Sequence, residues 1–267
     1  MKTKSNMTDN REIKIMLNIN QVYQGDCLEV MKGIPDKSID MILCDLPYGT
    51  TACKWDTIIP FEPLWEQYKR IIKDNGAIVL TASQPFTSAL VMSNPDMFKY
   101  CWYWDKEVGS SSLLAKIQPL RSMEDICVFY KKQSTYNPQM ELRKKENYRP
   151  LPKKNGSEIY NINPKIIDYN NGKYIYPKSR IVINGKGKEL NSKYKLHPTQ
   201  KPVALFEYLI KTYTNEGDLV LDNCAGSGTT GVACINLNRK YILIEKEPKY
   251  VEIINNRINN LPTRLPL

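Results

Sequence analysis

The chain has 267 residues, a hydrophobic content of 42% and a net charge of +10. These values fit one large α/β domain, or one domain that carries an inserted lobe. No apolar run approaches the roughly 18 residues of a membrane-spanning helix, and residues 1–10 are polar, unlike a secretory signal. The sequence therefore argues against a membrane protein or an exported one, and we expect a cytoplasmic protein.

Strands and helices are predicted to alternate along most of the chain. β-Branched and aromatic runs that end at Gly, Asp or Pro predict seven strands, at residues 21–24, 39–44, 77–82, 100–104, 126–130, 219–221 and 241–244. Helical patterns lie between several of them, at residues 27–33, 61–73, 85–92, 202–213, 230–237 and 248–256. This alternation predicts a mostly parallel sheet covered by helices on both faces.

The segment 133–196 breaks this alternation, with five prolines and seven tyrosines among its lysines. Disordered segments are typically poor in aromatic residues, so we expect an ordered functional lobe, with a flexible surface loop as the alternative. Residues 131–200 hold 16 Lys and Arg against 5 Asp and Glu, whereas the rest of the chain holds 22 against 23. A basic block of this kind is expected to attract a polyanion through salt-dependent phosphate contacts.

The cysteines do not indicate a metal site. The chain has seven of them, none in a Cys-x-x-Cys pair, and a single histidine. Zinc sites usually have closely spaced ligands. We therefore expect no metal ion and no disulfide framework, with the thiols serving as small core residues in a reducing compartment.

The predicted strand 39–44 leads directly into Asp45-Leu46-Pro47-Tyr48-Gly49. A buried strand that ends in an acidic residue, a proline and an aromatic ring brings a hydrogen-bond acceptor and a stacking surface to one point. Such a point suits a flat group that carries an amino function. Taken alone, these residues are also explained by a turn or a helix cap.

A second motif follows the predicted strand 219–221 and reads Asp222-Asn223-Cys224-Ala225-Gly226-Ser227-Gly228-Thr229-Thr230-Gly231. A glycine-rich turn that opens a helix brings the backbone close to a ligand and aims helix N-terminal amides at an anionic group. Glu245 ends the next strand, 23 residues after Asp222. A carboxylate at this spacing can accept hydrogen bonds from both hydroxyls of a ribose. Together these features predict a nucleoside-cofactor pocket.

Other interpretations of the glycine loop have to be weighed. A phosphate-binding loop of the Walker type ends in Gly-Lys-Ser/Thr, and no lysine follows the glycines here. The dinucleotide pattern G-x-G-x-x-G is matched by Gly226, Gly228 and Gly231, so the loop alone does not exclude NAD. A tight turn without any ligand is the remaining alternative.

Together the two motifs resemble those of the DNA amino-methyltransferases, which methylate N6 of adenine or N4 of cytosine. Their signature is a D/N/S-P-P-Y/F/W tetrapeptide with a D-x-F-x-G-S-G-T-T-like S-adenosylmethionine loop. Just ahead of the glycine loop, His197-Pro198-Thr199-Gln200-Lys201-Pro202 closely matches a hexapeptide of the family's beta class. That class is circularly permuted, with the catalytic tetrapeptide first, then a variable insert, then the cofactor loop.

The resemblance spans residues 22–257 apart from the insert. It implies a Rossmann-like, S-adenosylmethionine-dependent methyltransferase fold with a seven-stranded, mostly parallel sheet, helices on both faces and an inserted target-recognition lobe. Residues 18–132 would form the catalytic half of the methyltransferase domain, residues 133–196 the target-recognition region, and residues 197–260 the cofactor-binding half.

The resemblance also implies roles for individual residues. The catalytic tetrapeptide would be Asp45, Leu46, Pro47 and Tyr48, with the Asp45 carboxylate and the Leu46 carbonyl accepting the two N–H groups of an exocyclic amine. Tyr48 would stack on a base flipped out of the duplex. The implied residues for S-adenosylmethionine are Asp26, Cys27, Thr199, Lys201, Asp222, Cys224, Ala225, Gly226, Ser227, Gly228, Thr229, Thr230 and Glu245.

Some of these residues have a second explanation or depart from the family pattern. Asp26 is also explained as a helix N-cap, and His197 as a residue that orders its loop, since the reaction needs no imidazole base. Thr199 and Lys201 are assigned to the methionine end of the cofactor. Leu46 replaces the usual proline and leaves φ free where proline would fix it. Cys224 replaces a frequent phenylalanine and its aromatic packing.

The function implied by the resemblance is site-specific methyl transfer from S-adenosylmethionine to N6 of adenine in duplex DNA, since aspartate leads the tetrapeptide of most adenine enzymes. The alternatives are N4-cytosine methylation, a catalytically silent DNA-binding module, and methylation of RNA or of a protein amide. Duplex DNA is the expected partner, and a cognate restriction endonuclease is a candidate partner. A monomer or a homodimer is expected.

Overall fold

The computed structural model describes residues 17–51, 53, 56–110, 112–143, 173–185 and 200–261. All seven predicted strands and all six predicted helices are confirmed, some with shifted ends. In chain order the elements are β1 (Gln21–Gln24), α1 (Cys27–Met31), β2 (Ile39–Asp45), α2 (Phe61–Ile71), β3 (Ile72–Ala82), α3 (Phe86–Ser93), β4 (Phe98–Ser110), β5 (Arg121–Phe129), β6 (Glu141–Leu142), β7 (Tyr174–Ile175), β8 (Arg180–Val182), α4 (Val203–Tyr213), β9 (Leu219–Asp222), α5 (Thr229–Asn236), β10 (Lys240–Glu245) and α6 (Pro248–Asn259).

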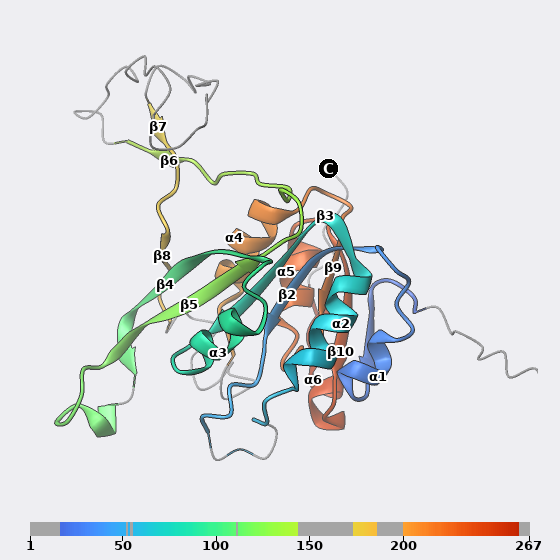
Figure 1. Ribbon diagram of the computed structural model, residues 1–267, viewed down its shortest axis with the longest axis horizontal. Helices are drawn as coiled ribbons and strands as arrows, with labels where there is room; N and C mark the ends of the chain where they lie inside the picture. The colour runs from blue at the N-terminus through green and yellow to red at the C-terminus, as the bar shows by residue number, and fades with distance from the viewer. Residues whose placement is uncertain are drawn as a thin grey trace, which may run out of the picture.

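One sheet joins the early and late parts of the chain (Figure 1). Its strand order is β1-β10-β9-β2-β3-β5-β4-β8. The pairs from β1 to β3 are parallel, whereas β5 runs antiparallel to both β3 and β4. The sheet has eight strands rather than the predicted seven, because β8 from the basic insert pairs in parallel with the edge strand β4. The sheet is therefore mostly parallel, as predicted.

Two hydrophobic cores cover the two faces of this sheet. Successive side chains of a strand point to opposite faces. Accordingly, Ile42 and Cys44 of β2 pack in the core formed with α1, α2 and α3, whereas Met41 and Leu43 pack in the core formed with α4, α5 and α6. All four side chains are fully buried. A strand that is apolar on both faces is typical of a parallel sheet between helical layers.

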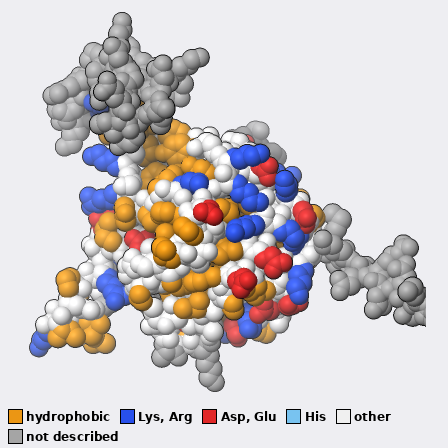
Figure 2. All heavy atoms as spheres, viewed as in Figure 1, with side chains coloured by type: hydrophobic (Ala, Val, Ile, Leu, Met, Phe, Trp, Pro, Cys, Tyr) orange, Lys and Arg blue, Asp and Glu red, His pale blue; other side chains and the backbone are white. Residues whose placement is uncertain are grey.

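Strands β4 and β5 are longer than predicted and form a hairpin that projects from the body (Figure 1). The predicted segments 100–104 and 126–130 cover only the part inside the sheet. The outer part is polar and lacks strand periodicity, because it has no helical layer to pack against. At its tip, Leu113 and Ile117 are 98% and 80% exposed, and Figure 2 shows this apolar patch in orange at the lower left.

The described part of the insert leaves the body and returns to it. Strands β6 and β7 form a small antiparallel pair away from the main sheet (Figure 1), and β8 then joins the edge of the main sheet. Residues 144–172 and 186–196 of the predicted target-recognition region lie outside the described residues. Among the helices of the described residues, none combines the length and apolar character that crossing a bilayer requires.

Candidate active site

Acidic residues meet at one edge of the sheet. Asp45, Asp222 and Glu245 are the last residues of β2, β9 and β10, and Asp26 follows β1. These four strands are parallel neighbours in the sheet, so their carboxyl ends lie at the same edge. From the β9–β2 pair the chain continues outward on both sides of the sheet, from β9 to β10 on one side and from β2 to β3 on the other. Ligands of open α/β sheets bind at such a switch point in the strand order. The four carboxylates line one cavity of about 1040 Å³.

The tetrapeptide that follows β2 forms part of the cavity wall. Asp45, Leu46, Pro47 and Tyr48 all line the cavity. The Tyr48 ring stacks on Phe86 of α3, with ring centroids 5.1 Å apart and an interplanar angle of 26°. Leu46 is only 4% exposed and packs in the core with α1, α2 and α3. A proline at position 46 would restrict the backbone by fixing φ. In this chain the buried leucine side chain restricts the same part of the backbone, which carries the Leu46 carbonyl.

Asp56 organises the loop after the tetrapeptide. Its Oδ1 accepts a hydrogen bond from Gly49 N at 2.9 Å, and its Oδ2 accepts from Thr50 N at 2.9 Å and Thr51 N at 2.7 Å. Burial alone would raise the pKa of Asp56, but the Thr51 side chain and these three N–H groups outweigh it and lower the pKa. The loop beside Tyr48 is thus closed around a charged carboxylate, a feature that the sequence analysis missed.

Asp45 makes its strongest contact with Lys201, which lies ahead of α4. Lys201 Nζ is 2.9 Å from Asp45 Oδ1 and 2.8 Å from Oδ2, and Oδ1 also accepts from the hydroxyls of Tyr48, at 2.7 Å, and Thr81. Burial would lower the pKa of the Lys201 ammonium, but the charges of Asp45 and Glu124 raise it above its ordinary value. Lys201 was predicted to bind the cofactor; the structure places it on the cavity wall, with its ammonium group on the Asp45 carboxylate.

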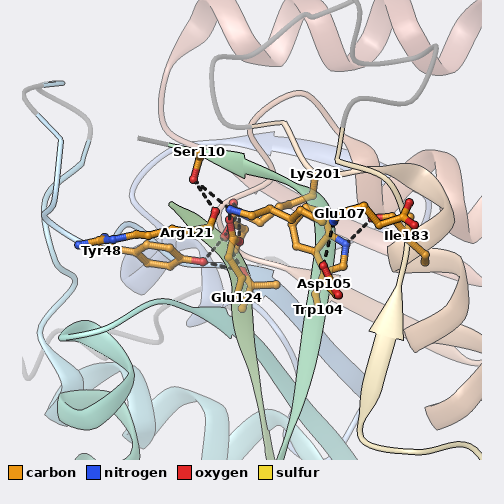
Figure 3. A network of polar contacts seen from close by, with 12 residues as sticks. Tyr48, Trp104, Asp105, Glu107, Ser110, Arg121, Glu124, Ile183 and Lys201 are labelled. Atoms are coloured by element: carbon orange, nitrogen blue, oxygen red, sulfur yellow. Dashed lines mark hydrogen bonds and ion pairs between the residues drawn. The ribbon is translucent and has the colours of Figure 1, made fainter. Parts of the chain in front are cut away.

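Two further charged residues of the hairpin continue this network (Figure 3). Glu124 of β5 lies 3.4 Å from Lys201 Nζ through Oε2, and 3.1 Å from Lys106 Nζ of β4 through Oε1. Both residues line the cavity, and the sequence analysis identified neither. The available signal was that Lys106 follows the predicted strand 100–104 by two residues and that Glu124 precedes the predicted strand 126–130 by two residues.

The glycine-rich loop lies beside Asp222. Asp222 Oδ1 accepts from Cys224 N at 3.1 Å, and Oδ2 accepts from the Thr230 hydroxyl. Burial raises the pKa of Asp222 to about 6, although these two donors favour the carboxylate. Gly228, the N-cap of α5, has a φ of +78° and approaches Ile254 so closely that a Cβ would lie 2.8 Å from its Cγ2. Only glycine suits both this conformation and this contact.

Glu245 holds the glycine loop as well as facing the cavity. Its Oε2 accepts from Gly226 N at 2.7 Å, and its Oε1 accepts from Glu247 N at 2.9 Å. Burial raises its pKa, against the opposing effect of these backbone donors. A carboxylate has about four acceptor positions, so both oxygens keep capacity for hydroxyl donors of a ligand.

Asp26 and two cysteines complete the wall near β1. Asp26 is the N-cap of α1, and its Oδ1 accepts from Leu28 N at 3.0 Å, which confirms the structural explanation given for it. Cys27 and Cys224 both line the cavity. Their contact and the burial of Cys27 raise the pKa of the Cys27 thiol, so it stays protonated at neutral pH. Cys224 thus packs on a thiol at the place where the family pattern often has an aromatic ring.

Most of the predicted site residues that are described lie on this cavity. The wall includes Asp26, Cys27, Asp45, Leu46, Pro47, Tyr48, Lys201, Asp222, Cys224, Ala225, Gly226, Ser227, Thr229 and Glu245. Gly228 and Thr230 do not line it; they support the loop from behind, through Ile254 and Asp222. Thr199 and His197 lie outside the described residues. Within the described ranges, no group of three or more His, Cys, Asp or Glu side chains is arranged to hold a metal ion.

The cavity fits a nucleoside cofactor together with a base. Its volume of about 1040 Å³ lies at the upper end of the range for ligand pockets. One end is lined by the glycine loop and the carboxylates of Asp26 and Glu245, which can accept from hydroxyl and amino groups. The other end is lined by the Asp45 carboxylate and the Tyr48 ring. The Asp45 carboxylate and the Tyr48 ring therefore face the same cavity as the glycine loop, Asp26 and Glu245.

Comparisons with known proteins agree with this geometry. The chain is 28% identical to the Type II methyltransferase M1.MboII of Moraxella bovis, with 92% of this chain and 99% of that protein aligned. It is 30% identical to the DNA adenine methyltransferase YhdJ of Escherichia coli (strain K12), with 87% and 80% aligned. The solved structure of the M1.HpyAVI-SAM complex is similar at a TM-score of 0.60 and 25% identity, covering 90% of this chain and 98% of that one.

A family model describes the match more generally. The DNA methylase model N6_N4_Mtase matches residues 39–256. The matched region contains the tetrapeptide, Lys201, the glycine loop and Glu245, which all contribute to the cavity wall. With the model covering most of the chain and its motifs lying in one cavity, the protein belongs to the DNA methylase family.

Proposed function

We propose that this DNA methylase transfers a methyl group from S-adenosylmethionine to N6 of adenine in duplex DNA. The observation that carries the proposal is that Asp45 and Tyr48 share one cavity with Glu245 and the glycine loop. The choice of adenine is supported by the aspartate at position 45 and by the name of the E. coli relative, a DNA adenine methyltransferase. The solved relative in complex with SAM supports the cofactor.

In the proposed reaction, Asp45 and Leu46 act on the amino group of the base. The lone pair of an exocyclic amine is delocalised into the ring, so the nitrogen is a poor nucleophile. Accepting its two N–H groups, through the Asp45 carboxylate and the Leu46 carbonyl, favours a pyramidal nitrogen with a directed lone pair. Tyr48 stacks on the flipped base and fixes its plane. Catalysis then rests on positioning and preorganised charge.

The cofactor would be held by the opposite end of the cavity. Glu245 would accept from the ribose hydroxyls, Asp26 would lie near the adenine, and the loop from Asp222 to Thr229 would enclose the remainder. When bound, S-adenosylmethionine supplies an electrophilic methyl group on a sulfonium. The order of the motifs, with Asp45 ahead of the glycine loop, supports assignment to the circularly permuted beta class.

The basic insert would bind DNA. Residues 131–200 carry a net charge of +11, and Lys and Arg would supply the phosphate contacts that position the duplex. A cognate restriction endonuclease is a further proposed partner of this protein, because the relative M1.MboII is named as a Type II methyltransferase.

The modified nucleoside tests the proposal. DNA from cells that express the protein is digested to nucleosides and analysed by mass spectrometry, with DNA from cells carrying the empty vector as the control. We expect N6-methyl-2′-deoxyadenosine to increase only with the protein. An increase in N4-methylcytosine instead would replace adenine by cytosine as the target, and DNA without any new methylation would contradict the proposal. Single-molecule sequencing of the same DNA gives the recognition sequence.

A further inference from the structure

Asp45 faces the cavity with the Lys201 ammonium against both of its carboxylate oxygens. Its Oδ1 accepts from the hydroxyls of Tyr48 and Thr81, and Lys201 Nζ contacts both carboxylate oxygens at 2.9 and 2.8 Å. A carboxylate has about four acceptor positions. If Asp45 accepts the N–H of a target base, as proposed above, the Lys201 ammonium competes with the exocyclic amino nitrogen for the Asp45 oxygens.

Glu124 offers this ammonium a second carboxylate. Glu124 Oε2 lies 3.4 Å from Lys201 Nζ. The same oxygen is buried and accepts no hydrogen bond within the described part of the chain, and buried polar atoms are rarely left without a partner. Figure 3 shows Lys201 and Glu124 pointing toward one another beside Tyr48. The ammonium can therefore satisfy Glu124 by closing this separation to hydrogen-bond length.

Glu124 is held where it can receive the lysine. It lies in β5 opposite Trp104 of β4, and its other oxygen, Oε1, is bound by Lys106 at 3.1 Å. The side chains of Lys201 and Glu124 are 9% and 18% exposed, so solvent has little access to the ammonium. A buried cation needs a nearby anion. Among the described residues, Asp45 and Glu124 are the carboxylates in ion-pair range of Lys201.

We propose that Glu124 is a positioning residue that takes over the Lys201 ammonium when the amino group of the target base binds Asp45. In the absence of a base, Lys201 occupies Asp45 and keeps it charged and oriented. When the base enters, the ammonium shifts to Glu124 Oε2 and releases acceptor positions on Asp45. Glu124 thus acts on the reaction through Lys201, without contacting the reacting atoms.

Glu124→Gln tests this role because it keeps the size of the side chain and removes its charge. Lys201 should then remain on Asp45 and compete with the base. On a duplex that contains the motif found by sequencing, we expect kcat/KM for DNA to fall about tenfold or more, from the usual strength of hydrogen bonds to charged groups. The loss should appear mainly in KM for DNA, with the affinity for S-adenosylmethionine unchanged.

Binding of the base gives a readout that does not depend on methyl transfer. A 2-aminopurine at the target position becomes fluorescent when it leaves the stack, and its signal is measured without S-adenosylmethionine. We expect Glu124→Gln to reduce this signal at a fixed protein concentration. Asp125→Asn is the matched control. It removes the neighbouring charge of the same strand, whose Oδ2 accepts from Thr87 on α3 at 2.7 Å and does not contact Lys201.

The double variant Glu124→Gln with Lys201→Met separates the proposal from a merely structural ion pair. Removing the ammonium as well should restore base binding above that of Glu124→Gln alone, because no cation then competes with the base for Asp45. A structural role would predict that the second substitution adds to the damage. If Glu124→Gln does not fold, Glu124→Asp replaces it. Aspartate keeps the negative charge but places it one methylene farther from Lys201, so we expect a smaller rise in KM for DNA than the rise predicted for Glu124→Gln.

The two proposals fail in different ways. A wild-type protein that methylates no DNA contradicts the proposed function. A wild-type protein that methylates adenine, together with a Glu124→Gln variant that matches Asp125→Asn in KM for DNA and in 2-aminopurine signal, overturns the role of Glu124 alone. A double variant that binds the base no better than Glu124→Gln also overturns it.

Discussion

Tyr48 allows the proposed binding of a flipped base to be tested with two substitutions at one position. Its ring stacks on Phe86 and lines the cavity, and its hydroxyl donates to Asp45 and lies 3.0 Å from Thr81 Oγ1. Tyr48→Phe removes only the hydroxyl, and Asp45 keeps Thr81 and Lys201 as partners. Tyr48→Ala removes the stacking surface as well. The ratio between the two variants therefore isolates the contribution of the ring.

The expected ratio follows from the energy of base stacking. Stacking of a base on an aromatic side chain contributes roughly 1–3 kcal/mol, which corresponds to about 5- to 150-fold in rate at 1.36 kcal/mol per factor of ten. We expect kcat/KM of Tyr48→Ala to lie below that of Tyr48→Phe by this factor. Tyr48→Phe should itself fall about tenfold or more below the wild type, because the Tyr48 hydroxyl donates to the charged Asp45 carboxylate and such hydrogen bonds contribute about 1.5–3 kcal/mol.

The assay is transfer of a tritiated methyl group from S-adenosylmethionine to duplex DNA over a range of DNA concentrations. Thermal denaturation and the affinity for S-adenosylmethionine show whether each variant keeps its fold and its cofactor site. If the two variants fold normally and have the same kcat/KM, Tyr48 does not stack on the base and the proposed position of the base is wrong.

Two further predictions concern the cofactor half of the cavity. Gly228→Ala should lower the melting temperature by several degrees, and by more than Gly217→Ala. Both positions have a positive φ, +78° and +82°, but a Cβ at 228 would clash with Ile254, whereas a Cβ at 217 meets nothing within 4 Å. Equal shifts in melting temperature would rule out the clash with Ile254. Asp222 has a pKa of about 6, above the ordinary 3.8. Ionisation of Asp222 therefore lowers the free energy of unfolding as pH rises through this range. Without cofactor, the free energy of unfolding of the wild type should fall by about 1–2 kcal/mol relative to that of Asp222→Asn between pH 5 and pH 8. Chemical denaturation at both pH values measures this difference, and a constant difference would show that Asp222 is not perturbed.

Local patterns predicted the sheet and the position of its motifs well. β2 and β9 are short apolar runs that end in Asp45 and Asp222, and such runs between helices are typical of a parallel sheet. Because parallel strands end at the same edge, the two motifs lie on one cavity. Strand β8 was not predicted because it has only three residues and pairs with a distant strand, β4, whereas the outer part of the β4–β5 hairpin was not predicted because its residues are polar.

The charged network could not be predicted from the sequence in the same way. Lys201 and Asp45 are separated by 156 residues, and no local spacing relates them. The hexapeptide pointed to Lys201 as a functional residue, but the group that it contacts is determined by how α4 packs on the sheet. Glu124 lies in a polar stretch of β5 without any motif, and its position beside Lys201 is set by its pairing with β4.

The most direct test of the account is methyl transfer by Asp45→Ala. Lys201 keeps Glu124 as an ionic partner in this variant, so the fold and the binding of S-adenosylmethionine should persist. We predict that the rate of N6-methyladenine formation in duplex DNA falls by about 1,000-fold or more, as expected for loss of a preorganised charged group at the reacting atom. A variant that binds the cofactor and still methylates adenine at the wild-type rate would contradict the central claim that Asp45 activates the amino group.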